Sequence, residues 1–132
     1  MAENSHGVLH RIVLHAARSK QFPEGSIRHG FEIVAPLTES GRIDLDSWKT
    51  HRGLCTVHRF WGDEAPLRGQ LAHRPGGAGG ATWAFEYGPQ RDVENESGYR
   101  FGDHFFRVGE YVSIREPDSE LLTFKVVSVE NP

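Results

Sequence analysis

Turn-forming residues recur along the whole chain and leave only short segments between them. Clusters rich in Gly, Pro, Asn or Asp interrupt the sequence roughly every 8 to 15 residues, and the intervening segments alternate apolar and polar residues. This spacing is typical of antiparallel sheets, because βαβ units need longer helical segments between their strands. We therefore predict an all-β, mainly antiparallel fold, either a small β-sandwich or a partly open β-barrel of about seven strands.

One segment is ambiguous and one short helical turn is expected. The apolar residues of 8–17 fit a helical stripe, whereas their β-branched run and the absence of a good capping residue favour a strand. A single helical turn near Trp48 could be capped by Asp44 or Asp46. The remaining predicted strands are 29–37, 54–61, 67–73, 81–87, 105–115 and 121–129.

Three segments are expected to lie outside the sheet. The acidic stretch 92–98 has no hydrophobic period and is predicted to be a solvated loop, and residues 1–6 are expected to be disordered. The glycine-rich tract 75–80 lacks the Gly-Lys-Ser/Thr ending of a phosphate-binding loop, so we predict a flexible hairpin tip. No repeat or second unit is found, and 1–132 is interpreted as a single domain.

The first of two hairpins has a register predicted from its turn. A four-residue loop at 116–119, with proline at its second position, suits a type I turn. This register pairs Tyr111 with Phe124 and Ile114 with Leu121, and it also pairs residues of opposite charge.

The second hairpin joins the strands predicted at 67–73 and 81–87. Matching their apolar faces places Leu71 beside Trp83. The glycine-rich tract then forms the tip of this hairpin.

Charge and cysteine content limit the partners and the compartment. Fifteen Lys and Arg against eighteen Asp and Glu give a net charge of -3 without any basic run, so we expect no nucleic-acid partner. No apolar run approaches the roughly 20 residues of a membrane span, so no membrane partner is expected either. Cys55 is the only cysteine, which suits a reducing compartment, and the first residues lack a secretory pattern. The cytoplasm is the expected location.

Few residues are spaced as catalytic or metal-binding groups require. No two histidines are separated by two positions, the useful spacing on a strand, so no metal and no other cofactor is predicted. Cys55 and His58 fall on opposite faces of a strand and cannot form a dyad, and Cys55 is interpreted as a small buried hydrophobe. His104, which acidic residues precede, is kept as a candidate site residue.

The strand at 54–61 supplies the main candidate site. One face of this strand carries His58 and the other carries Arg59, so either orientation directs one of them inward. The inward residue is expected to line a pocket or to be hydrogen-bonded. Sequential strands usually pair, which predicts that Arg59 and Trp61 gather with His73 at one end of the sheet, beside the glycine-rich tip. The candidate binding residues are Arg59, Trp61, His73, Trp83, His58 and His104.

These observations favour a binding function. Because no catalytic constellation is found, we expect a non-enzymatic binding or protein-interaction module whose partner is a protein or a small molecule. A small-molecule enzyme with a pocket lined by His and Arg is the alternative. A single-stranded nucleic-acid binder that stacks bases on its aromatic residues ranks third, because the chain is acidic.

Overall fold

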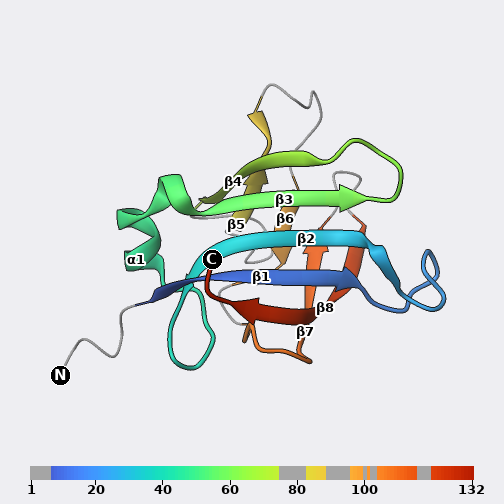
Figure 1. Ribbon diagram of the computed structural model, residues 1–132, viewed down its shortest axis with the longest axis horizontal. Coiled ribbons are helices and arrows are strands. Elements are labelled where there is room, and N and C mark those ends of the chain that lie inside the picture. The colour runs from blue at the N-terminus through green and yellow to red at the C-terminus, as the bar shows by residue number, and fades with distance from the viewer. Residues whose placement is uncertain (1–6, 75–82, 89–95, 100, 102–103, 116–119) are drawn as a thin grey trace.

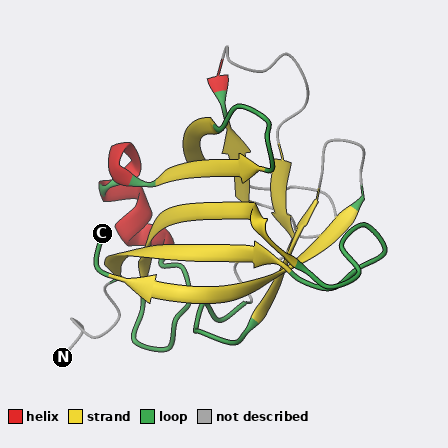
Figure 2. Cartoon of the chain, turned by 45° about the vertical axis from the view of Figure 1, so that its right-hand side comes forward, coloured by secondary structure: helices red, strands yellow, loops and turns green. Residues whose placement is uncertain are grey.

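Eight antiparallel strands, each hydrogen-bonded to the next along the chain, form a closed barrel (Figures 1 and 2). The pairing of the last strand with the first closes the sheet and leaves no free edge. The computed structural model describes residues 7–74, 83–88, 96–99, 101, 104–115 and 120–132. The strands are β1 (Val8–Ala16), β2 (Ser26–Leu37), β3 (Thr56–Trp61), β4 (Leu67–His73), β5 (Trp83–Glu86), β6 (Glu96–Tyr99), β7 (Tyr111–Arg115) and β8 (Leu121–Glu130).

The predicted all-β antiparallel class is confirmed, with corrections to the strand count. The ambiguous segment at 8–17 is the strand β1. β6 was missed, because residues 96–98 were assigned to the solvated loop 92–98, and it is held by pairing with both β5 and β7. The predicted strand 105–115 is a strand only over β7. Residues 1–6, 75–80 and 92–95 lie outside the described residues.

Aromatic rings fill the inside of the barrel. Alternate residues of each strand point inward, as the burial pattern of β3 shows, and the ring of Phe31 lies 5.3 Å from that of Phe85 and 5.2 Å from that of Phe124. Large side chains on facing strands therefore interdigitate across the barrel axis. The most deeply buried large side chains are Phe31, Phe85, Phe101, Phe106, Phe124, Ile12, Leu14, Ile33, Leu71, Ile114 and Val57.

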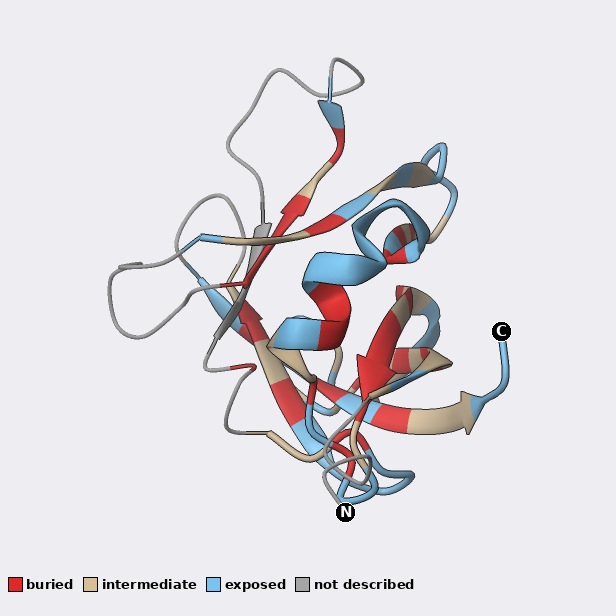
Figure 3. Ribbon diagram, turned by 90° about the vertical axis from the view of Figure 1, so that its left-hand side faces the viewer, coloured by how far each residue is buried: buried red, intermediate tan, exposed pale blue. Residues whose placement is uncertain are grey.

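A short helix, α1 (Leu45–Thr50), lies across one opening of the barrel, which we call the helix end (Figures 1 and 3). Asp44 caps it by accepting a hydrogen bond from the Ser47 backbone N–H, so the predicted helical turn is confirmed and Asp44 is the cap. Trp48 is buried, and its indole N–H donates to the Leu71 carbonyl oxygen at 2.9 Å. A 3₁₀ turn, η2 (Arg52–Leu54), leads into β3. Among the described residues, no helix is both long and apolar enough to cross a membrane.

The opposite opening, which we call the loop end, carries the connection 17–25 between β1 and β2 (Figure 1). The register between these strands changes sharply here, because His15 pairs with Gly30 while Ala16 pairs with Ser26. Three residues of β2, 27–29, therefore have no partner on β1. Such a bulge bends the strand and redirects the loop that precedes it.

Both predicted hairpin registers are displaced. In the β7–β8 pair, Val112 lies opposite Phe124 and Ile114 opposite Leu122, one residue away from the predicted pairing. These four side chains are buried, whereas Tyr111 is exposed. A one-residue shift exchanges the two faces of a strand, so burial of the interior residues selects the observed register.

The β4–β5 pair differs from its prediction by two residues. Leu71 lies opposite Phe85, and His73 opposite Trp83. The shift leaves the same residues on the inner face, because side chains alternate with a period of two. The predicted faces are therefore correct although the predicted partners are wrong.

Candidate functional site

The predicted gathering of Arg59, Trp61 and His73 does not occur. Arg59 pairs with Leu67, the first residue of β4, whereas His73 is its last. Along an extended strand, the six residue steps from Leu67 to His73 span roughly 20 Å. Because β3 and β4 are antiparallel, Arg59 and Trp61 lie at the loop end and His73 lies towards the helix end.

Arg59 and Trp61 belong to an aromatic cluster inside the loop end. Arg59 is only 6% exposed, with its guanidinium carbon 4.2 Å from the centre of the Trp61 ring and its Nη1 3.6 Å from a Glu64 carboxylate oxygen. His29, opposite Trp61 on β2, packs edge-on against that ring at 4.9 Å. Phe22 from the loop packs on His29 at 4.6 Å. The cluster thus closes this end of the barrel.

Burial and neighbouring positive charge act together on His29. Burial is the main cause that lowers the pKa of His29, and the charges of Arg28 and Arg59 lower it further. Glu64 and Asp63 oppose these effects and do not outweigh them. The neutral imidazole is therefore the favoured form in the folded protein.

Trp83 belongs to the core near the helix end, and the partly buried His73 packs against it. The Trp83 ring is 3% exposed, 4.8 Å from the His73 ring and 5.4 Å from the Trp48 ring. Burial lowers the pKa of His73, and the charge of Lys49 adds to this effect. These residues pack the junction between α1 and the barrel.

His58 lies on the outer face of β3, in a row with Glu32 on β2 and Arg68 on β4. The three residues line a small hollow of about 150 Å³, and the His58 Nε2 atom is buried there without a hydrogen-bond partner among the described residues. His104, the last of the six candidates, is half-buried with its ring 6.4 Å from that of Phe101. His58 thus lies on the face of β3 opposite to Arg59 and Trp61.

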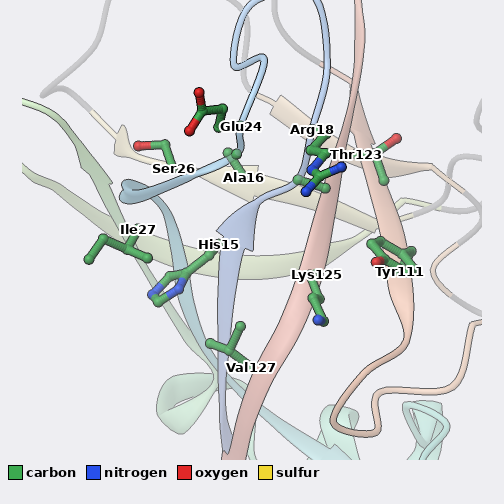
Figure 4. Close-up of a pocket in the computed structure, with 12 residues that line it drawn as sticks. His15, Ala16, Arg18, Glu24, Ser26, Ile27, Tyr111, Thr123, Lys125 and Val127 are labelled. Carbon is green, nitrogen blue, oxygen red and sulfur yellow. The ribbon is translucent and has the colours of Figure 1, made fainter.

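A larger pocket of about 580 Å³ lies on the outer wall of the barrel near the loop end, and we call it the wall pocket (Figure 4). Its volume falls in the range of small-molecule sites. It is formed by the outer faces of β1, β7 and β8 together with the loop 17–25 and the start of β2. The lining residues are His15, Ala16, Ala17, Arg18, Glu24, Gly25, Ser26, Ile27, Tyr111, Thr123, Lys125 and Val127.

The strand residues of the wall pocket form one cross-strand row. Lys125 on β8 pairs with His15 on β1 and with Tyr111 on β7. In Figure 4, His15 and Ile27 lie on one side of the pocket, and Lys125 and Tyr111 on the other. Burial lowers the pKa of His15, so its neutral form is favoured.

Two cations, Arg18 and Lys125, line the wall pocket. Within the part of the chain that the structure describes, the side chains of Arg18 and Lys125 form no hydrogen bond and no ion pair. Among the described lining residues, Glu24 is the only carboxylate, and in Figure 4 it is turned away from Arg18. These residues therefore carry two positive charges against one negative charge.

A serine and a histidine come into contact at the edge of this pocket. The Ser26 Oγ lies 2.7 Å from the His29 Nδ1, which is within the reach that a serine nucleophile and its base require. The Ser26 hydroxyl, however, is directed away from Arg18 and Lys125 (Figure 4). It also accepts a hydrogen bond from the Arg28 backbone N–H, which is typical of a local turn. The contact therefore lies within the bulged part of β2.

None of the six candidate residues predicted from the sequence lines the wall pocket. Its lining comes from both ends of the chain, and no local motif connects residues 15–27 with residues 111–127. The one sequence pattern that could have pointed to this pocket is the alternation of polar residues in β8, where Thr123 and Lys125 are exposed between buried neighbours. That pattern identifies a solvent face and does not show that a loop lies beside it.

Cys55 agrees with its prediction as a small buried hydrophobe. It is fully buried, and burial raises the pKa of its thiol to about 11, so the reactive thiolate is suppressed. In the described part of the chain, no three His, Cys, Asp or Glu side chains come together as metal ligands would.

Comparison of the sequence and structure with known protein families, curated proteins and solved structures found no match.

Proposed function

We propose that this protein is a non-enzymatic binding module that holds a small molecule in the wall pocket. The observation that carries the proposal is the pocket itself, about 580 Å³ in volume, in which apolar, hydroxyl-bearing and charged side chains converge. Ligand sites typically combine such an apolar surface with a few polar groups that orient the ligand.

The position of the pocket also supports binding. His15, Lys125 and Tyr111 stand on three paired strands of a closed barrel, which holds their backbones rigidly. Arg18 comes from a loop, which can adjust to a ligand. A rigid scaffold beside an adaptable loop is the usual arrangement of a recognition site.

An enzymatic role has less support. Ser26 is directed away from the cations of the pocket, and the Cys55 thiol is buried with a raised pKa. We keep the enzyme as the second candidate because of the Ser26–His29 contact. Labelling of Ser26 by a fluorophosphonate probe, lost in Ser26→Ala, would favour it over the binding module.

The proposal includes a cytoplasmic location and no nucleic-acid partner. The single buried cysteine suits a reducing compartment. The aromatic residues that could have stacked bases are largely enclosed, since Trp61, Trp83 and Phe85 are buried. Titration with fluorescent single-stranded DNA at physiological salt should give a Kd no tighter than the nonspecific range, about 0.1 mM.

A fragment screen by two-dimensional ¹⁵N–¹H NMR tests the binding site. Fragments that bind should shift the amide signals of residues lining the wall pocket. In Thr123→Trp, an exposed β8 position where the new ring fills the pocket, these shifts should disappear. Gln70→Trp, at an exposed position on β4 away from the pocket, is the matched control and should retain them. Shifts that survive Thr123→Trp would contradict the proposal.

A further inference from the structure

We infer that the ligand of the wall pocket is a small organic acid, a carboxylate or a phosphate monoester on a compact apolar body, and that Arg18 and Lys125 bind its acid group. This inference rests on the proposed function and names the chemical class of its ligand.

Two cations from separate elements line the wall pocket. Arg18 belongs to the loop 17–25 and Lys125 to β8, and both line the same pocket (Figure 4). Neither side chain is paired within the described part of the chain. By contrast, Arg28 is paired with Asp63, and Arg74 with Glu86. The wall pocket thus holds cations whose hydrogen-bond donors remain available to a ligand.

Neutral hydrogen-bond donors lie beside these charges. The hydroxyl groups of Tyr111 and Thr123 flank Lys125 on β7 and β8, and the imidazole of His15 lies across from it on β1. Hydroxyl and imidazole N–H groups donate to oxyanions, and hydrogen bonds with a charged partner are about twice as strong as neutral ones. Arginine also binds carboxylate and phosphate in a bidentate manner. A ligand oxyanion would therefore find donors on both sides.

Part of the pocket lining is apolar. Ile27 is 76% exposed, on the bulged part of β2, and it lies on the side of the pocket opposite Lys125 (Figure 4). Val127 continues the outer face of β8 beyond Lys125, and Ala17 contributes a small side chain. A compact apolar ligand body would remove Ile27 from water while its acid group faces the cations.

Calorimetric and NMR titrations with three probes of similar shape test this inference. Benzoate and phenyl phosphate carry the acid group as a carboxylate and as a phosphate, and benzamide is the neutral isostere of benzoate. Both acids, or one of them, should bind at least tenfold more tightly than benzamide. Higher salt should weaken the acids and leave benzamide unchanged.

Variants assign the effect to the two cations. Arg18→Gln/Lys125→Gln should weaken acid binding at least tenfold, whereas Lys20→Gln, on the same loop but outside the pocket lining, should leave it unchanged. Acid binding that persists in the double variant, or equal binding of benzamide and both acids, would overturn the inference.

The outcomes separate this inference from the proposed function. Benzamide that shifts wall-pocket amides as strongly as the acids would leave the pocket as the binding site and reject the acid class. Acids that leave the wall-pocket amides unshifted would reject the acid class. The proposed function would also be rejected if benzamide and the screened fragments left those amides unshifted.

Discussion

The Arg59 guanidinium lies over the face of the Trp61 ring, 4.2 Å from its centre, inside the loop end of the barrel. A desolvated cation above an indole face is held by the ring's quadrupole. Its carboxylate neighbour Glu64 is 67% exposed, so the ion pair is screened by water on one side. We therefore expect Arg59 to contribute to stability, and its role in ligand binding stays a prediction.

Replacing Arg59 tests this role. Arg59→Ala should lower the free energy of unfolding by about 2 kcal/mol, because it removes the cation–π contact and leaves a cavity beside Trp61. For a chain of 132 residues this corresponds to a decrease in Tm of about 7 °C. Arg28→Ala is the control, because the Arg28–Asp63 pair is 63% and 96% exposed, and it should change stability by less than about 0.5 kcal/mol. Equal Tm values for the two variants would contradict the assignment.

Gly30 is required where β1 and β2 approach each other. A Cβ atom at Gly30 would collide with the Leu14 carbonyl oxygen and would lie 2.9 Å from the Phe60 Cζ. Gly30→Ala should therefore destabilise the fold by about 3 kcal/mol, measured by chemical denaturation. Gly53→Ala should stay within about 0.5 kcal/mol of the wild type, since no atom lies within 4 Å of the added Cβ. A Gly30→Ala protein as stable as Gly53→Ala would refute the observed β1–β2 register.

Phe22 is expected to position the loop that carries Arg18. Its ring packs on His29 and, at 5.8 Å, on Trp61, so it anchors 17–25 to the barrel without lining the wall pocket. Phe22→Ala should weaken the binding of phenyl phosphate by about fivefold, or about 1 kcal/mol, although the protein stays folded. Val108→Ala, at a site 65% exposed in another loop, is the control. Unchanged affinity in Phe22→Ala would show that the loop holds its position without this anchor.

Stability should decrease on acidification. Burial lowers the pKa of His15, His29 and His73, so below pH 6.5 the unfolded chain binds more protons than the folded one. The stabilisation is fully present above pH 6.5 and is lost as the pH falls through the lowered values. Tm measured between pH 7.5 and 5 should therefore fall, and less so in a variant with all three residues changed to Gln. A Tm that rises on acidification would contradict the lowered pKa values of these histidines in the folded protein.

Much of the fold follows from local sequence. Alternation of apolar and polar residues identifies the strands 67–73 and 121–129, the β-branched run favours a strand at 8–17, and a capping residue identifies the turn at Trp48. β6 could not be recognised in this way, because Glu96–Tyr99 has no hydrophobic period and is a strand only through its two neighbours. Turn chemistry also failed to set the register of β7 and β8, since burial of Val112 and Phe124 selects it.

The position of the candidate site could not be predicted from local sequence, because it depends on contacts between distant strands. From the sequence, His73 was predicted near Arg59 because sequential strands usually pair. In an antiparallel pair, however, the end of one strand lies beside the start of the next, so Arg59 lies opposite Leu67 and far from His73. The wall pocket combines His15 and Lys125, which come together only when β8 pairs with β1 and closes the barrel. Closure is a property of the whole sheet and leaves no local pattern.

The most direct test of the account is to locate a bound acid by intermolecular NOEs. With phenyl phosphate at saturating concentration, the ring protons should give NOEs to the side chains of Ile27 and Val127, and the Arg18 and Lys125 signals should shift. Such contacts would place the ligand in the wall pocket with its phosphate towards the two cations. NOEs confined to other faces of the barrel, or none to the wall pocket at saturation, would contradict binding of the acid in the wall pocket.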